Sequence, residues 1–145
     1  MIETASTALV LPRSLHRRIT GHARSTWPRE AVGLVGGVAA GVAQEVIALT
    51  NLATGSGRFF ADPYEQFCAL RRFEAEGLQP LAIYHSHPAG ALEPSALDVD
   101  HGRRWQCLHL IVAVGRPDLP DGTCRAFHIA EDGAVHPARV LIADG

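Results

Sequence analysis

The sequence predicts an α/β fold, with strands and helices alternating in a single domain that spans residues 1–145. Two observations lead to this prediction. Short apolar runs of strand length alternate with segments whose apolar residues recur at helical spacing. Clusters of glycine and proline fall between these segments and mark turns. A chain of 145 residues with 47% hydrophobic residues is long enough to bury one core.

An edge strand and an amphipathic helix are predicted at the start of the chain. Residues 9–11 form a short apolar run, and the proline that follows opens a helix over residues 12–27. We interpret His16 and His22 as surface residues of this helix. Its apolar face is predicted to comprise Leu15, Ile19, Ala23 and Trp27.

A hairpin follows the first helix. Residues 31–35 and 42–49 are predicted as strands, joined by the glycine-rich turn 36–41. This turn lacks the Lys-Ser/Thr pair of a phosphate-binding loop and the spacing of a dinucleotide fingerprint. Residues 51–57 are polar and predict a loop, and residues 58–60 predict another strand.

The middle of the chain predicts two helices and the strand between them. Asp62 and Pro63 suit the start of a helix that continues to about Glu76, before Gly77. Residues 81–84 follow a proline and read as a buried strand. A helix is then expected over residues 95–104.

Three strands complete the predicted sheet. Residues 107–114 are almost continuously Leu, Ile and Val, which predicts a central strand with His109 packed inside it. Residues 124–130 and 134–142 predict two more strands, joined by a turn at 131–133.

Composition excludes several classes of partner. A net charge of −2 leaves no electrostatic footprint for nucleic acid or a membrane surface, and the paired arginines suit solvated helix faces. No apolar run approaches the ~18 residues of a membrane span, and we find no secretion signal. The three cysteines, Cys68, Cys107 and Cys124, form no C-x-x-C pair and are expected to be buried free thiols. We therefore expect a cytoplasmic protein.

The residues that carry chemistry cluster after the strand at 81–84. His85 and His87 are two apart on an extended segment, so both imidazoles project to one side. Ser95 and Asp98 are three apart and share one face of a first helical turn. Two imidazoles and a carboxylate are the three protein ligands of a catalytic zinc ion, which leaves its fourth position for water.

Each half of this constellation also has a purely structural interpretation. A histidine pair at a strand end suits a solvated turn, and Ser95-x-x-Asp98 suits a helix capping box. What favours the metal site is the order of both halves on one short segment. A base for the water is available upstream, because Glu30 enters an apolar strand where a charge is costly without a partner or a function.

Taken together, these residues resemble the JAMM (MPN-plus) motif of zinc metalloproteases. Glu30-x-x-Gly33 is followed by His85-x-His87, seven residues, and then Ser95-x-x-Asp98. Every motif position is filled, and the resemblance covers almost the whole chain. It implies a cytidine-deaminase-like three-layer fold, with a curved mixed β-sheet flanked by helices.

The resemblance also implies a mechanism. His85, His87 and Asp98 would bind one Zn²⁺, and Glu30 would take a proton from the zinc-bound water and pass it to the leaving amine. The family pattern assigns Ser95 a hydrogen bond to the tetrahedral oxyanion. Glu30 and Ser95 are thus the predicted catalytic residues, and no other cofactor is expected.

The implied substrate is a ubiquitin-like or sulfur-carrier protein, cut after its C-terminal Gly-Gly. The short segment between Asp98 and Cys107 leaves little room for the insertions of chain-cleaving members, so the compact prokaryotic type is favoured. The alternatives are a deubiquitinase-like isopeptidase on a ubiquitin-like conjugate and a non-catalytic MPN scaffold module. A DNA-repair branch is disfavoured by the near-neutral charge, and a nucleobase deaminase by the missing cysteine pair.

Overall fold

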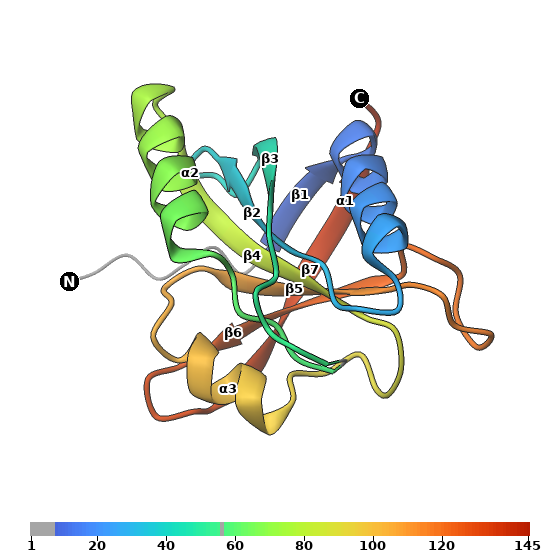
Figure 1. The fold of residues 1–145 in the computed structure, drawn as a ribbon. Helices are drawn as coiled ribbons and strands as arrows, with labels where there is room; N and C mark the ends of the chain where they lie inside the picture. Colours follow the sequence, from blue (N-terminus) through green and yellow to red (C-terminus); the bar gives the residue numbers. More distant parts are fainter. Residues whose placement is uncertain (1–7, 56) are drawn as a thin grey trace.

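One curved sheet of seven strands organises the molecule. The computed structural model describes residues 8–55 and 57–145. Along the sheet the strands follow the order β1-β7-β6-β5-β4-β2-β3 (Figure 1). The pairs β1–β7 and β4–β5 are parallel and the other pairs are antiparallel, so the sheet is mixed. The strands are β1 Ala8–Pro12, β2 Val32–Gly37, β3 Ala43–Leu49, β4 Gln79–His87, β5 Leu108–Ala113, β6 Cys124–Ile129 and β7 Val135–Ala143.

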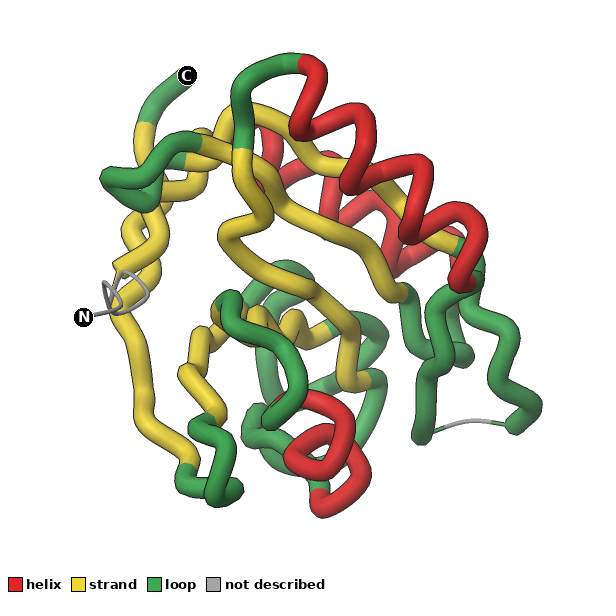
Figure 2. The backbone as a smooth tube through the Cα atoms, turned by 90° about the vertical axis from the view of Figure 1, so that its left-hand side faces the viewer, coloured by secondary structure: helices red, strands yellow, loops and turns green. Residues whose placement is uncertain are grey.

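Helices cover both faces of this sheet. Helix α1 (Arg13–Thr26) packs Leu15 and Ile19 on the face that carries Tyr84. Helix α2 (Pro63–Ala75) packs on the opposite face, with Phe73 in the same cluster as Ile83. The two helices flank strands β2 to β4, while the short helix α3 (Ala96–Gly102) lies apart from both (Figures 1 and 2). The predicted three-layer α/β arrangement is confirmed.

Strand β5 is central in the sheet, as its apolar sequence predicts. All six of its residues are buried, His109 among them. Its parallel neighbour β4 is buried from Ala82 to His87. A strand with both faces covered must be apolar throughout, so the histidines at the end of β4 are exceptions that call for a physical explanation.

One predicted strand is wrong. Residues 58–60 are not part of the sheet, and only an isolated bridge joins Asn51 to Ala61. The side chain of Asn51 takes the place of a strand partner, because it donates to the carbonyl of Arg58 and accepts from the amide of Phe60. The predicted loop 51–57 holds, apart from Ser56, which lies outside the described residues.

Several side chains differ from expectation in their exposure. Trp27 is 52% exposed, because α1 ends at Thr26 and Trp27 follows it as the C-cap, where its ring lies over Gly115. His16 and His22 are half-buried and bonded to the Gly122 carbonyl and the Tyr84 hydroxyl, so they are not simple surface residues. Of the three free thiols, Cys107 is buried, Cys124 half-buried and Cys68 exposed, which corrects the expectation for Cys68.

Across residues 8–55 and 57–145, no helix combines the length and the apolarity that a membrane crossing would require. The predicted absence of a secretion signal concerns in part residues 1–7, which lie outside the described residues.

Candidate metal centre

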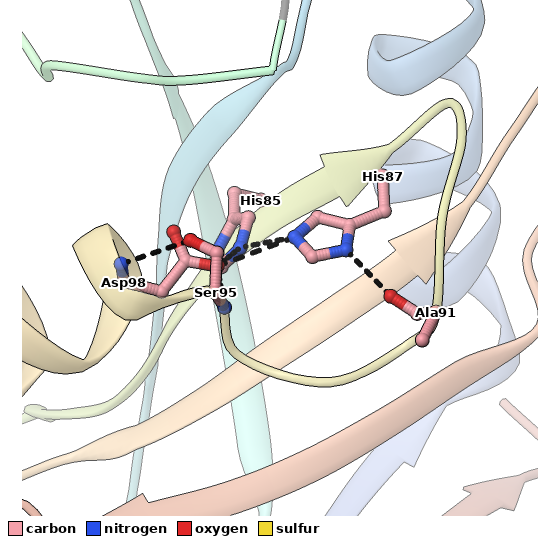
Figure 3. Close-up of polar contacts among 5 residues, drawn as sticks. All are labelled: His85, His87, Ala91, Ser95 and Asp98. Carbon is pink, nitrogen blue, oxygen red and sulfur yellow. Dashed lines mark hydrogen bonds and ion pairs between the residues drawn. The ribbon is translucent and has the colours of Figure 1, made fainter.

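The end of β4 brings two imidazoles together. His85 and His87 point to the same side of the strand, and their Nε2 atoms are 3.0 Å apart (Figure 3). His85 is fully buried and His87 is 8% exposed. The predicted strand continues three residues further than its apolar run, because β5 pairs with β4 as far as His87.

Helix α3 supplies the third side chain. Asp98 Oδ2 lies 3.2 Å from His85 Nε2 and 3.3 Å from His87 Nε2. The same oxygen accepts a hydrogen bond from the backbone amide of Ser95 at 2.9 Å, and Ser95 Oγ accepts from the amide of Asp98 at 3.1 Å. The capping box that the sequence offered as an alternative is therefore present, and it orients the carboxylate toward the histidines.

These three atoms are spaced as ligands of one small cation. Zinc–nitrogen distances are about 2.0–2.1 Å, so two ligands of a tetrahedral zinc lie about 3.3 Å apart. His87 Nδ1 lies 3.0 Å from the carbonyl of Ala91, the outer contact that commonly fixes the tautomer of a metal-binding histidine. His85 Nδ1 is buried and has no hydrogen-bond partner among the described residues. The donor set fits zinc.

Electrostatics give His85 and Asp98, but not His87, the protonation states that metal binding requires. Burial lowers the pKa of His85, against the opposing influence of Asp98, so this imidazole is neutral at pH 7. Burial alone would raise the pKa of Asp98, but hydrogen bonds from His85 and His87 hold it far below its usual value. A neutral imidazole and an ionised carboxylate are the forms that bind a metal ion. Burial lowers the pKa of His87, but its hydrogen bond with Asp98 and the charge of Glu30 raise it overall, so this imidazole must lose a proton to bind a metal ion.

Glu30 lies beside this centre in the loop that leads into β2. It is 4% exposed, and its Oε1 has no hydrogen-bond partner among the described residues. Glu30, His85 and His87 each have a donor atom within 4.8 Å of the others. Burial raises the pKa of this carboxyl group to about 7, opposed by the charge of His87 and supported by that of Asp98. A buried carboxylate without a partner is costly in free energy unless something binds there.

Two polar side chains that the sequence did not single out for the site hold the Glu30 segment. Ser86 lies between the two histidines and faces the other way, where its Oγ accepts a hydrogen bond from the Ala31 amide at 2.8 Å. Asn51 donates to the carbonyl of Glu30 at 2.9 Å. Strand alternation alone predicts that Ser86 faces away from His85 and His87. The hydrogen-bond partner of Ser86, in contrast, depends on the pairing of β4 with β2.

Phe59 was also missed as a site residue. Its ring stacks on His85, with centroids 4.6 Å apart and planes at 29°. The stacking fixes the plane of an imidazole whose Nδ1 has no partner in the described structure. In the sequence Phe59 belongs to the segment predicted as a strand, so no signal assigned it to the site.

The comparisons with known proteins agree with this geometry. A family model described as prokaryotic homologs of the JAB domain matches residues 12–130. The chain belongs to this family. The match includes Glu30, both histidines, Ser95 and Asp98, so the prediction of a compact prokaryotic JAMM/MPN protein is confirmed.

Two relatives of this JAB-family chain carry names that state an activity. A probable TtuB-protein conjugate cleaving protease of Thermus thermophilus is 38% identical over 124 residues, covering 85% of this chain and 77% of that protein. A CysO-cysteine peptidase of Mycobacterium tuberculosis is 30% identical over 137 residues, covering 94% and 92%. The prediction of a peptidase is confirmed at the level of enzyme class.

Solved structures share the fold. The solution structure of a Desulfitobacterium hafniense protein has a TM-score of 0.82 at 29% identity and covers 94% of each chain. A JAB1/MPN domain protein of Archaeoglobus fulgidus has a TM-score of 0.58 at 23% identity, covering 92% of this chain and 98% of that one. The roles of individual site residues in this JAB-family chain stay predictions.

Proposed function

We propose that this chain is a zinc-dependent peptidase that hydrolyses the bond after the C-terminal Gly-Gly of a ubiquitin-like or sulfur-carrier protein. The observation that carries the proposal is the convergence of His85, His87 and Asp98 beside the buried, unpartnered carboxylate of Glu30. The names of the two relatives support a carrier-protein substrate.

His85, His87 and Asp98 would hold the metal ion. Zinc, when bound, supplies Lewis acidity that polarises the scissile carbonyl and makes a water molecule more acidic. Asp98 is held by the capping box on α3 and the histidines by the pairing of β4 with β5, so the ligand geometry is set before substrate arrives.

Glu30 would move the proton. As a carboxylate it accepts a proton from the attacking water, whose oxygen bonds to the carbonyl carbon of the last glycine. The C–N bond then breaks, Glu30 passes its proton to the leaving amine, and the carrier is left with a free carboxyl group. With a pKa near 7, this group can act in both directions at neutral pH.

Ser95 would stabilise the oxyanion. Its Oγ accepts a hydrogen bond from the Asp98 amide, so the hydroxyl proton is not used by that contact. Ser95 is exposed at the start of α3, beside the ligand Asp98, where a substrate carbonyl could receive that proton.

A second candidate is an isopeptidase that acts on proteins conjugated to a ubiquitin-like modifier. The relative whose name states that it cleaves TtuB-protein conjugates favours this reading. The chemistry at His85, His87, Asp98 and Glu30 is the same in both cases, since only the amine that leaves differs. A non-catalytic scaffold module would not need the buried carboxylate of Glu30.

The test is mass spectrometry of intact carrier proteins. The zinc-loaded protein is incubated with TtuB and CysO, each engineered to end in Gly-Gly followed by one residue, and with a TtuB conjugate. We expect loss of the terminal residue after Gly-Gly, and we expect a chelator to abolish it. Carriers that keep their full mass with the zinc-loaded protein would refute the proposed function.

A further inference from the structure

A cavity of about 250 Å³ adjoins the candidate metal centre. Asp98 lines it, and so does Phe59, the ring that stacks on His85. The remaining walls come from the loop before α2, from α2, β4 and β5, and from the end of α3 with the residues that follow it. Because Asp98 both lines the cavity and contacts His85 and His87, the cavity borders the candidate ligands. It lies on the sheet face that also carries α2 and Ile83.

The walls of this cavity are largely apolar and aromatic. Most of the apolar and aromatic surface comes from Phe59, Phe60, Ile83 and Trp105. The acidic residue in its lining is Asp98, whose Oδ2 is engaged by both histidines and by the Ser95 amide. A cavity of this size is smaller than the 300–1,000 Å³ typical of drug-sized ligands, so it suits a single amino-acid side chain.

Besides Asp98, four polar side chains line the cavity, those of Gln66, His101, Arg104 and His109. His109 is buried, and its Nε2 has no hydrogen-bond partner within the described residues. Arg104 is exposed just after α3 and forms no ion pair within residues 8–55 and 57–145. The cavity thus combines largely apolar walls with the polar side chains of Gln66, His101 and His109 and one cation, Arg104.

We infer that this cavity receives the residue released from the carrier, with an uncharged apolar side chain inside it and the free α-carboxylate paired with Arg104. The inference rests on the proposed function. The residues before the cut would be glycines, which have no side chain to fill a cavity. A side-chain pocket beside the metal centre therefore serves the residue after the cut, and Arg104 would select a terminal residue over a protein-linked lysine.

The first test is independent of catalysis. The chain has two tryptophans, Trp27 and Trp105, so its indole N–H groups give two signals in a ¹⁵N-labelled protein. Titration with free leucine should shift the Trp105 signal saturably and leave that of Trp27 unchanged. Leucinamide and aspartate should bind more weakly, as should leucine to the Arg104→Gln variant. An unmoved Trp105 signal would overturn the inference.

The second test compares substrates. TtuB ending in Gly-Gly-Leu should be cleaved with a kcat/KM about tenfold above that of Gly-Gly-Asp. A leucine amide at the end should lower kcat/KM about fivefold, and Arg104→Gln should remove this difference between acid and amide. The matched control is Arg103→Gln, since Arg103 is also exposed and does not line the cavity.

A second pair of variants probes the apolar wall. Phe60→Ala should reduce the preference for leucine over aspartate about threefold. Phe67→Ala is the control, because the exposed fractions of Phe60 and Phe67 are 52% and 56% but only Phe60 lines the cavity. Equal cleavage of all single-residue extensions would contradict the proposed side-chain pocket and would remain consistent with the proposed peptidase function. Failure to cleave any of them would instead refute the proposed function.

Discussion

Glu30 and Asp98 are two buried carboxyl groups in one site, and their surroundings drive their pKa values apart. Asp98 is paired with two imidazoles and a backbone amide, so it stays ionised. Glu30 Oε1 has no hydrogen-bond partner among the described residues, and burial raises the pKa of Glu30 to about 7. Such a division is typical of sites in which one carboxylate is structural and the other transfers protons.

Replacing Glu30 by glutamine should separate metal binding from turnover. The side chain keeps its size but can no longer accept a proton, so we expect kcat to fall by about 10²–10⁴-fold. Zinc content, measured by elemental analysis, should be unchanged. The exposed Glu93 provides the control substitution Glu93→Gln, which should keep full activity. Normal turnover in Glu30→Gln would contradict the proposed base.

The three thiols should differ in reactivity at pH 8. Burial raises the pKa of Cys107 to about 12 and that of Cys124 to about 11. Both are therefore thiols at pH 8, and the thiolate is the reactive form. Cys68 is exposed on α2. We expect iodoacetamide to label Cys68 first, with the order read by peptide mass spectrometry. Faster labelling of Cys107 would contradict this order.

At the scale of elements, the pairing of β2 with β4 builds the site. Val32 lies opposite His85 in the antiparallel register, and Ser86 accepts from the amide of Ala31. This pairing brings the Glu30 loop against the ends of the two histidines. Gly33 allows it, because a Cβ at that position would lie 2.3 Å from the ring of Tyr84.

Gly33→Ala should therefore destabilise the protein. We expect the free energy of unfolding to fall by about 1–3 kcal/mol, since the Tyr84 ring is buried and must shift. Gly21→Ala is the control, because α1 leaves open space at that position. It should raise stability by about 0.5–1 kcal/mol through helix propensity. Urea unfolding measures both, and equal midpoints would contradict the role assigned to Gly33.

At the scale of the whole molecule, the candidate centre joins elements that are distant in sequence. The loop before β2, the end of β4 and the start of α3 meet there, and the sheet face beneath them also carries α2 (Figures 1 and 3). A ligand that binds only this folded arrangement stabilises it by mass action.

Metal removal should consequently lower thermal stability. At free zinc about 100 times its Kd, binding adds about 2.7 kcal/mol to the free energy of unfolding. We expect a chelator to lower the Tm of the wild type and to leave the Tm of His87→Ala unchanged, because that variant lacks one predicted ligand. Differential scanning calorimetry with and without chelator measures this. A chelator-insensitive wild type would contradict the ligand set.

Much of the fold follows from local patterns. Every strand of the sheet and all three helices lie where periodicity and turn residues predict them, with ends displaced by at most three residues. The error at residues 58–60 arose because the Asn51 side chain bonds the Arg58 carbonyl and the Phe60 amide, which a strand would pair with a neighbouring strand. Side-chain competition of this kind has no periodic signature.

The sequence by itself determined the histidine pair on one side of a strand and the aspartate in a capping box, because strand alternation and helix capping act over a few residues. Only the tertiary structure decided that these groups meet Glu30 and that Ser86 holds the Glu30 segment. The same is true of the apolar cavity beside Asp98. These features depend on contacts such as Ala31 with Ser86, 55 positions apart, which chain packing creates and local pattern does not encode.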